Sequence, residues 1–549
     1  MEPFDGEGEV EELIDRAHNL LQINNPEEAL EILAQAEEKS PNNGWVQLFR
    51  GSAYGQMERQ EEAVDEILKA ADSNLDDIDI QVESAHQLSY LQHYQDALIS
   101  ANRAIKLDSH DAGAYMAQAD AMEQLGRINE ALVAREDALA LEPEDQENLY
   151  YYALDLCDVG RFHEAFKYAE LLYNKMDDDP DILRLYGATL SYLARHSEAI
   201  AIWDKLEELE GETGILLYNR ATSLDAIGLS EEAQTLIEKA IDLEPDVAVN
   251  HLAYGTMLER AGKEEQAITE YLTTLELDDE VLEAALRIVD LAIEIDAVAP
   301  ALESIEEMLK LKPDNAILIY VQGRLMIESS DVDIVIEGEQ KIELAANKQP
   351  KLSVAWFSLA KLYHEQNRFD EALRAIERAT GDYGDDASLW VIRALSYVGN
   401  KKYVEAMECF DKACELDPGD EKPWLYMGRM LMIDLNRSAD ARNAFLESLH
   451  RRPDNPEAMW MLALCHLRVG DMNDASDVVN RLLKVDPFYV RGLLVRAALR
   501  AQTGKITAAF ADLRAAMKLG YDTTYVVEEP LFAPLWNDPR MKKLNKYQI

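Results

Sequence analysis

Apolar and polar residues recur with the spacing of amphipathic helices along almost the whole chain, and the helical segments come in pairs. Residues 112–125 (AGAYMAQADAMEQL) and 126–143 (GRINEALVAREDALALEP) form one such pair, with Gly126 at the break. Apolar residues three or four positions apart share one face of a helix. A glycine between two such segments marks the turn that joins them. The pattern therefore predicts a helical hairpin that is repeated along the chain.

A small residue occupies the same place in each hairpin. Its spacing is 34 residues through the first ten copies, and only Val289 is larger than alanine. The series is Ala17, Gly51, Ala85, Ala119, Ala153, Gly187, Ala221, Gly255, Val289, Gly323, Ala360, Ala394, Gly428, Ala463 and Ala497. A second small residue follows about twelve positions later, from Ala29 to Ala509. A 34-residue period over fifteen copies predicts an all-α solenoid of helix-turn-helix repeats.

The close crossing of two helices explains the small residues, because a larger side chain at the contact would push the two backbones apart. Twelve copies carry an acidic residue just before the second small position. There, in the first turn of the second helix, a negative charge complements the helix dipole. Eight copies end the second helix with a proline, which cannot continue it. Twelve repeats thus contain a signal that starts the second helix, and eight contain one that stops it.

These features together resemble the tetratricopeptide repeat family, with Gly or Ala at repeat position 8, Ala at 20 and 27, and Pro at 32. The family's aromatic residue at position 11 is kept only as Tyr54, Tyr363 and Tyr397. The resemblance implies a right-handed superhelix of about fifteen repeats, in which the first helix of each repeat lines the concave groove. Residues 524–549 resemble the closing stretch of many bacterial members, so a bacterial source is expected. Leu531, Phe532, Leu535 and Trp536 are expected to cover the open end of the last repeat.

Two interruptions of the period predict local irregularities. The step from Gly323 to Ala360 is 37 residues, so three residues are inserted near 329–338, at the turn between the two helices. Gly338 also replaces the usual alanine in that repeat. One further residue enters between Gly428 and Ala441. The first interruption is the expected hinge.

Acidic and basic residues are unevenly distributed along the chain. Of the net charge of −52, residues 1–350 contribute 25 Lys and Arg against 77 Asp and Glu, whereas residues 351–549 carry 28 of each kind. We therefore distinguish a flexible acidic N-terminus (1–9), acidic repeats 1–10 (10–350), charge-balanced repeats 11–15 (351–523) and a capping segment (524–549). The acidic field opposes binding to nucleic acid and favours basic partners.

Cysteine usage and the absence of long apolar runs bear on the cellular compartment. Cys157, Cys409, Cys414 and Cys465 have unrelated spacings, which favours reduced thiols over a disulfide framework or a zinc motif. The chain begins without a signal-peptide pattern and contains no stretch apolar enough to span a membrane. A cytoplasmic location is expected.

Catalytic signatures are missing from the helical repeats. The chain contains no phosphate-binding loop, no His-Glu-x-x-His and no Gly-x-Ser-x-Gly sequence. His364 and His466 invite a metal or acid-base role, but packed or surface histidines are the favoured interpretation. The sequence therefore predicts a protein that is not an enzyme and has no cofactor and no metal site.

Repeat geometry predicts where a partner would bind. Positions 2, 5, 9 and 12 of each first helix are expected to face the groove, and positions 5 and 9 lie one turn apart. From the tenth repeat onward these positions place apolar side chains beside cations. The candidate partner-binding residues are Tyr320, Arg324, Phe357, Lys361, Leu425, Arg429, Trp460 and Arg491. The alternative is that these side chains pack against neighbouring helices or pair with local acids such as Glu328.

The function expected from these observations is a non-catalytic scaffold or adaptor that binds proteins or peptides in the groove. The C-terminal groove suits an acidic and hydrophobic segment, and residues 1–350 suit a basic surface. Two alternatives remain: an acidic holdase or inhibitor of a basic protein, and a structural scaffold that assembles with copies of itself. The family's chaperone-tail site is disfavoured, because position 9 never holds the asparagine that such a site requires.

Overall fold

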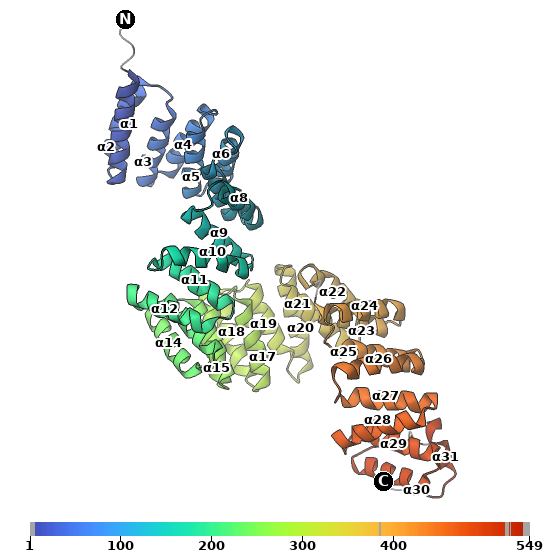
Figure 1. Cartoon of the computed structure of the whole chain (residues 1–549). Coiled ribbons are helices and arrows are strands. Elements are labelled where there is room, and N and C mark those ends of the chain that lie inside the picture. The colour runs from blue at the N-terminus through green and yellow to red at the C-terminus, as the bar shows by residue number, and fades with distance from the viewer. Residues whose placement is uncertain (1–5, 384–385, 522–525, 527–528, 542–549) are drawn as a thin grey trace. The chain divides into compact units, whose positions relative to one another are not determined.

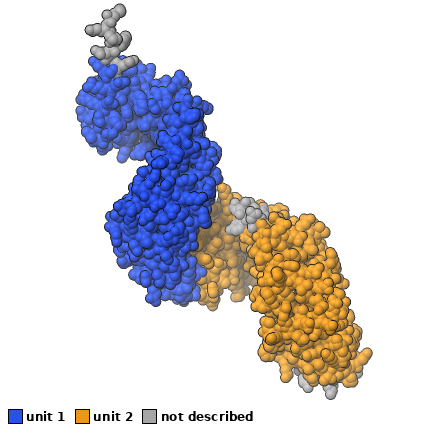
Figure 2. Space-filling view, viewed as in Figure 1, with its two compact units in different colours: residues 1–270 blue, residues 271–549 orange. Residues whose placement is uncertain are grey.

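The computed structural model describes residues 6–383, 386–521, 526 and 529–541, and within them it contains helices and no strand. Two compact units divide the chain, residues 1–270 and residues 271–549 (Figure 2). The division falls inside helix α16 (Glu264–Leu277). The charge boundary near residue 350 therefore lies within the second unit.

The first unit is a series of helical hairpins (Figure 1). Its helices are α1 (Gly6–Gln22), α2 (Pro26–Lys39), α3 (Gly44–Gln56), α4 (Gln60–Ser73), α5 (Ile78–Tyr90), α6 (Tyr94–Leu107), α7 (Ala112–Gln124), α8 (Ile128–Leu141), α9 (Gln146–Asp158), α10 (Phe162–Lys175), α11 (Pro180–Tyr192), α12 (His196–Glu210), α13 (Gly214–Ala226), α14 (Ser230–Leu243) and α15 (Ala248–Arg260). Odd-numbered helices are the first helices of their repeats.

The second unit has the same construction. Its helices are α17 (Leu282–Glu294), α18 (Val298–Leu311), α19 (Ala316–Met326), α20 (Val332–Lys348), α21 (Ser353–Glu365), α22 (Phe369–Tyr383), α23 (Ala387–Gly399), α24 (Tyr403–Leu416), α25 (Lys422–Arg429), α26 (Ser438–Arg451), α27 (Pro456–Val469), α28 (Met472–Val485), α29 (Val490–Gln502), α30 (Ile506–Lys518) and α31 (Ala533–Trp536). The expected all-α repeat solenoid is confirmed.

Polar side chains start the first helix of many repeats. The carboxylate of Asp111 accepts a hydrogen bond from the backbone N–H of Ala114 at 2.7 Å, and the amide oxygen of Asn315 accepts one from Leu318 at 2.8 Å. Such caps satisfy backbone donors that have no partner inside the helix. The turn to the second helix passes through a left-handed residue, such as Gly126 at φ +72°. Local sequence therefore sets both the start of the first helix and the turn that leads to the second helix.

A recurring triad closes several hairpins. In the repeat of α21 and α22, the Arg368 guanidinium stacks 4.2 Å from the centroid of the Tyr363 ring and donates hydrogen bonds of 2.7 Å to both oxygens of Glu371. Tyr54, Arg59 and Glu62 repeat this arrangement in α3 and α4. We call this tyrosine, arginine and acid the closing triad. Its arginine–acid half also occurs in four other repeats, as Arg127–Glu130, Arg161–Glu164, Arg195–Glu198 and Arg437–Asp440.

The small residue of each first helix matches the size of a side chain on the second helix. A Cβ built on Gly187 would lie 2.6 Å from the nearest ring atom of Trp203, which is only 1% exposed. A Cβ on Gly428 would lie 2.6 Å from the ring of Phe445. These glycines therefore make room for the large side chains across the hairpin.

We expect Gly187→Ala to lower the free energy of unfolding by about 1–3 kcal/mol, because the new methyl group overpacks the seam against Trp203. In the double variant Gly187→Ala/Trp203→Leu, the smaller leucine should accept that methyl group. The loss in the double variant should fall short of the sum of the two single losses by about 1 kcal/mol or more. Urea unfolding measures the loss of unfolding free energy in the two single variants and in the double variant. Strictly additive losses would contradict the idea that Gly187 makes room for Trp203.

The first interruption lengthens the turn after α19 (residues 327–331) and the helix that follows it, whereas the second is accommodated within a helix. Where three residues are inserted, α20 has 17 residues, compared with 14 in a typical second helix such as α8. The single extra residue after Gly428 forms a π-helical turn over Met430–Asp434, in which the Leu435 N–H donates to the Met430 carbonyl at 3.1 Å. A π-helical turn admits one more residue without breaking the helix. The register of the flanking repeats is thereby kept.

Residues 529–541, near the C-terminus, pack on α29. Phe532, Leu535, Val526 and Met541 are at most 6% exposed and belong to one apolar cluster with Phe510. Leu531 is partly buried against the same cluster, whereas Trp536 is 41% exposed and donates its indole N–H to the Val526 carbonyl at 3.1 Å. Of the four residues expected to cover this end, Phe532 and Leu535 are thus the buried ones.

All four cysteines are free thiols. Cys409 and Cys465 are buried, and Cys157 and Cys414 are half-buried. Burial raises the pKa of each thiol to about 11. At neutral pH the thiolate, which is the reactive form, is therefore scarce.

Candidate partner-binding surface

The eight candidate residues lie on first helices of the second unit, but they divide by exposure. Tyr320 on α19 is 2% exposed and its hydroxyl lies 3.1 Å from Ser358 Oγ of α21. Leu425 on α25 is 5% exposed and belongs to an apolar cluster. For these two positions, packing against neighbouring helices is the correct interpretation, because their side chains fill the contact between adjacent helices. They cannot serve as anchors for a ligand in this conformation.

Helices α19 and α21 bring together one part of the candidate surface. Arg324 is partly exposed and lies 4.0 Å from the carboxylate of Glu328, four residues further along the chain. On α21, Phe357 is half-buried and Lys361 is exposed one turn later. Lys361 makes no ion pair with any residue that the structure describes. Lys361 thus presents an unneutralised charge beside a partly exposed aromatic ring.

A second part extends across α25, α27 and α29. The guanidinium of Arg429 lies 3.6 Å from the carboxylate of Glu457, and that of Arg491 stacks 4.9 Å from the centroid of the Trp460 ring. Glu457 and Trp460 are three residues apart on α27, so they share a face of that helix. Arg429 and Arg491 are exposed, and Trp460 is half-buried. This strip combines two cations with one aromatic platform.

Sequence reasoning missed a buried ion cluster in the first unit. Arg135 on α8 is fully buried and donates to Asp155 at 2.7 Å, to Asp120 at 3.0 Å and to Glu123 at 2.8 Å. Asp120 and Glu123 are acids that the repeat pattern assigns to the groove, where they would be free for a basic partner. Their pairing with Arg135 neutralises part of that charge. The sequence did contain a signal for this cluster. Arg135 is a charged residue at a repeat position that holds Leu33 or another apolar residue in the other copies.

Burial strongly perturbs one member of this cluster. Removal of the Asp155 carboxylate from water raises its pKa to about 6, although the nearby Arg135 guanidinium acts in the opposite direction. The Asp155 side chain is 2% exposed, whereas those of Asp120 and Glu123 are 38% and 29% exposed. Arg135 is therefore the partner on which the ionised form of Asp155 depends.

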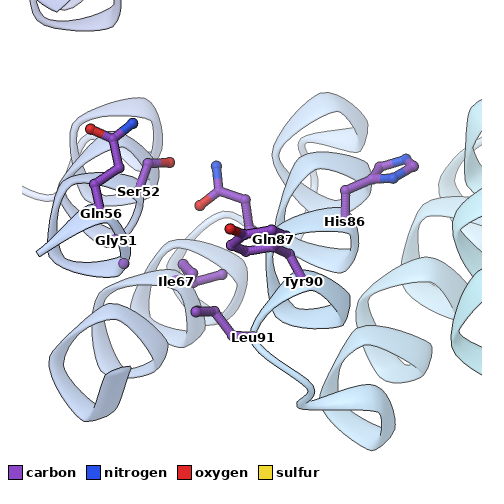
Figure 3. Close-up of a pocket in the computed structure, with 9 residues that line it drawn as sticks. Gly51, Ser52, Gln56, Ile67, His86, Gln87, Tyr90 and Leu91 are labelled. Carbon is purple, nitrogen blue, oxygen red and sulfur yellow. The ribbon is translucent and has the colours of Figure 1, made fainter. Parts of the chain in front are cut away.

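The first unit also contains a pocket between its first helices (Figure 3). Its volume is about 370 Å³, and it is lined by Ser52 and Gln56 of α3, Ile67 of α4, and Gln87 and Tyr90 of α5, among others. Ser52 and Gln56 donate to the backbone carbonyls of Leu48 and Leu21. The pocket is large enough for one or two side chains of a peptide.

The two histidines singled out from the sequence differ in their surroundings. His364 Nδ1 lies 3.2 Å from Ser396 Oγ, and burial lowers the pKa of His364, which keeps the ring neutral. His466 is 8% exposed at the end of α27 and faces two carboxylates. His364 is thus a packed histidine, as expected, whereas His466 has a different environment.

Within the described part of the chain, no helix has both the length and the apolar character that crossing a bilayer would require.

Comparison with known proteins places three stretches in one family. Residues 216–247, 357–421 and 432–499 match tetratricopeptide repeat family models. Among curated proteins, the chain is similar to a TPR repeat-containing protein of Methanocaldococcus jannaschii, with 24% identity over 31% of this chain and 32% of that protein. It is also similar to the BBSome complex member BBS4 homolog of Drosophila melanogaster, with 24% identity over 36% of this chain and 40% of that protein. The chain thus spans two fifths or less of the length of these relatives.

Solved structures with similar helices have low identity. Yeast Tom70 matches with a TM-score of 0.35 and 15% identity, covering 84% of this chain and 99% of that chain. The APC/C hetero-tetramer Cut9-Hcn1 matches with a TM-score of 0.35 and 14% identity, covering 82% and 95%. The family matches agree with the helical hairpins and their 34-residue period. Residues 216–247, 357–421 and 432–499 of this chain are thus tetratricopeptide repeats.

Proposed function

We propose that this chain is a non-catalytic scaffold that binds an acidic and apolar segment of a partner protein along the first helices of its second unit. The observation that supports the proposal is the exposure of three cations near two partly exposed rings. Lys361 lies on the same helix as Phe357, and Arg429 and Arg491 lie on helices that contact α27, which carries Trp460. Aromatic and arginine side chains supply most of the binding energy at protein interfaces. The buried side chains of Tyr320 and Leu425 pack beneath this surface and do not contact the partner.

A charge reversal tests the proposed surface. In the triple variant Lys361→Glu/Arg429→Glu/Arg491→Glu, each cation becomes an acid that repels an acidic peptide. We expect peptides selected on the wild-type chain from a displayed library to lose at least about tenfold in affinity for this variant, as removal of interface anchors does. Fluorescence anisotropy with the synthesised peptides measures the dissociation constants, and far-UV circular dichroism should show unchanged helicity.

A matched control makes the same change of charge on second helices and loops. Lys310, Lys412 and Arg452 are exposed cations of the same unit. Reversal of these three should leave peptide affinity within about threefold, because exposed charges away from an interface act weakly through salt-screened solvent. Selection of basic peptides, or equal losses in both triple variants, would contradict the proposed surface.

The acidic charge of residues 1–350 favours a second candidate function, the holding of a basic protein. This segment carries 77 acidic against 25 basic residues. Binding of a basic protein there should weaken steeply between low and physiological salt. The buried cluster around Arg135 shows that part of this acidic charge is neutralised within the fold.

A further inference from the structure

A cluster of His466, Asp471 and Asp474 joins the end of α27 to the start of α28. One ligand atom from each residue lies within 4.8 Å of the other two. His466 Nδ1 is 3.7 Å from Asp471 Oδ2 and 4.0 Å from Asp474 Oδ2. Gly470, in the left-handed conformation at φ +98°, reverses the chain between the histidine and the two acids. The turn thus brings three potential ligands of a cation together.

His466 Nδ1 lacks the partner that a buried ring nitrogen normally has. The residue is 8% exposed, and Nδ1 makes no hydrogen bond. Both neighbouring carboxylate oxygens are too distant for a hydrogen bond. Ligand atoms bound to one zinc ion at about 2.1 Å lie roughly 3–3.6 Å apart. The two distances from His466 Nδ1 to the carboxylate oxygens exceed the upper end of this range by only a few tenths of an ångström. A bound cation would satisfy a buried polar atom that is otherwise left without a partner.

Comparison with the closing triads of the other repeats shows what this turn lacks. His466 stands at the repeat position of Tyr363, Asp471 at that of Arg368, and Asp474 at that of Glu371. The tyrosine, arginine and acid have therefore become histidine and two acids. Replacement of the arginine by Asp471 removes the cation from the centre of the triad and adds a negative charge in its place.

One neighbouring cation partly compensates for this change. Arg442 of α26 places Nη1 3.2 Å from Asp471 Oδ2, and its side chain is 34% exposed. Arg442 donates this hydrogen bond to Asp471 and leaves His466 Nδ1 without a partner. Arg442 therefore competes with a bound cation for one carboxylate, while the histidine nitrogen remains without a partner.

We propose that His466, Asp471 and Asp474 bind a divalent cation of the zinc class. One imidazole and two carboxylates suit Zn²⁺, whereas Mg²⁺ prefers an all-oxygen shell. His466 and Asp474 also line a pocket of about 610 Å³ between α26, α27 and α28, which gives the ion and its completing water molecules an entry path. The bound ion ties the two helices together in the role that Arg368 plays in its own repeat.

Zinc titration of the untagged full-length chain by isothermal titration calorimetry tests the site. We expect one Zn²⁺ per chain, with Mg²⁺ unable to compete at equal concentration. Asp474→Asn and His466→Gln should each weaken binding by at least about tenfold, the size of loss caused even by outer-shell changes at metal sites. Because the Asp474 side chain is 66% exposed, Asp474→Asn should fold normally even if the histidine variant does not.

Two further variants separate this site from adventitious binding. His450 lines the same pocket but lies outside the cluster, so His450→Gln should bind zinc like the wild type. Arg442→Gln removes the competing cation and should tighten zinc binding. Absence of saturable binding to the wild-type chain, unchanged affinity in Asp474→Asn, or an equal loss in His450→Gln would overturn the proposal.

Discussion

Replacement of Arg135 by leucine is expected to lower the free energy of unfolding by about 3–5 kcal/mol, because it leaves the buried Asp155 carboxylate without its cation. Asp120 and Glu123 are partly exposed and can be hydrated when Arg135 is lost, but the Asp155 side chain is 2% exposed. The cost therefore falls mainly on Asp155. Urea unfolding followed by circular dichroism measures the loss.

The pH dependence of this loss has a definite sign. The folded-state pKa of Asp155, about 6 in the presence of Arg135, already exceeds the ordinary aspartate value of 3.8. A raised folded pKa gives stability that is present below the unfolded pKa and is lost as pH rises through the folded pKa. Removal of Arg135 raises the folded pKa further. The variant should therefore be more destabilised relative to wild type at pH 8 than at pH 5.

A double variant distinguishes the unpaired charge from a simple packing defect. In Arg135→Leu/Asp155→Ala, both buried charges are gone. The residue that corresponds to Asp155 in the preceding repeat is Ala121. Most of the lost stability should return, because replacing a whole buried pair by apolar residues is often neutral. As a surface control, Arg127→Ala removes an exposed pair with Glu130 and should cost less than about 1 kcal/mol. A double variant no more stable than Arg135→Leu alone would refute this account.

Gly323→Ala is expected to lower the free energy of unfolding by about 2–3 kcal/mol, since a Cβ here meets backbone as well as a side chain. That Cβ would lie 2.7 Å from the Gly338 carbonyl oxygen and 2.9 Å from the Ile342 backbone nitrogen. A rigid backbone cannot move aside as the end of a flexible side chain can. The loss of unfolding free energy in urea should exceed that of Gly187→Ala, where the obstacle is the Trp203 ring.

The same substitution at Gly55 is the control. Gly55 also lies inside a first helix, but the nearest atom to its Cβ would be 3.8 Å away on Leu91. Gly55→Ala should stabilise the chain by about 0.4–1 kcal/mol, because alanine restricts the unfolded chain without strain in the folded one. If both variants changed stability in the same direction, close contact between α19 and α20 would not be the reason for Gly323.

Periodic features of the chain were predictable because they arise from local rules that repeat. Position-specific alanines, capping residues and breaks determine each hairpin from within 34 residues, and repetition makes the signal unmistakable. The single insertion after Gly428 could be located by counting, although its form, a π-helical turn over Met430–Asp434, could not. For the same reason, each candidate residue lies on the first helix of its repeat, as its repeat position predicts.

The sequence by itself determined the repeat, the number of hairpins and the division of charge, because these depend on spacing and composition along the chain. Only the tertiary structure decided that Tyr320 and Leu425 are buried while Lys361 and Arg491 are exposed. It alone brought Arg135 to Asp155 and left His466 Nδ1 without a partner. Exposure and pairing depend on how the next hairpin packs against each helix, and a position within one repeat does not specify its neighbour's side chains.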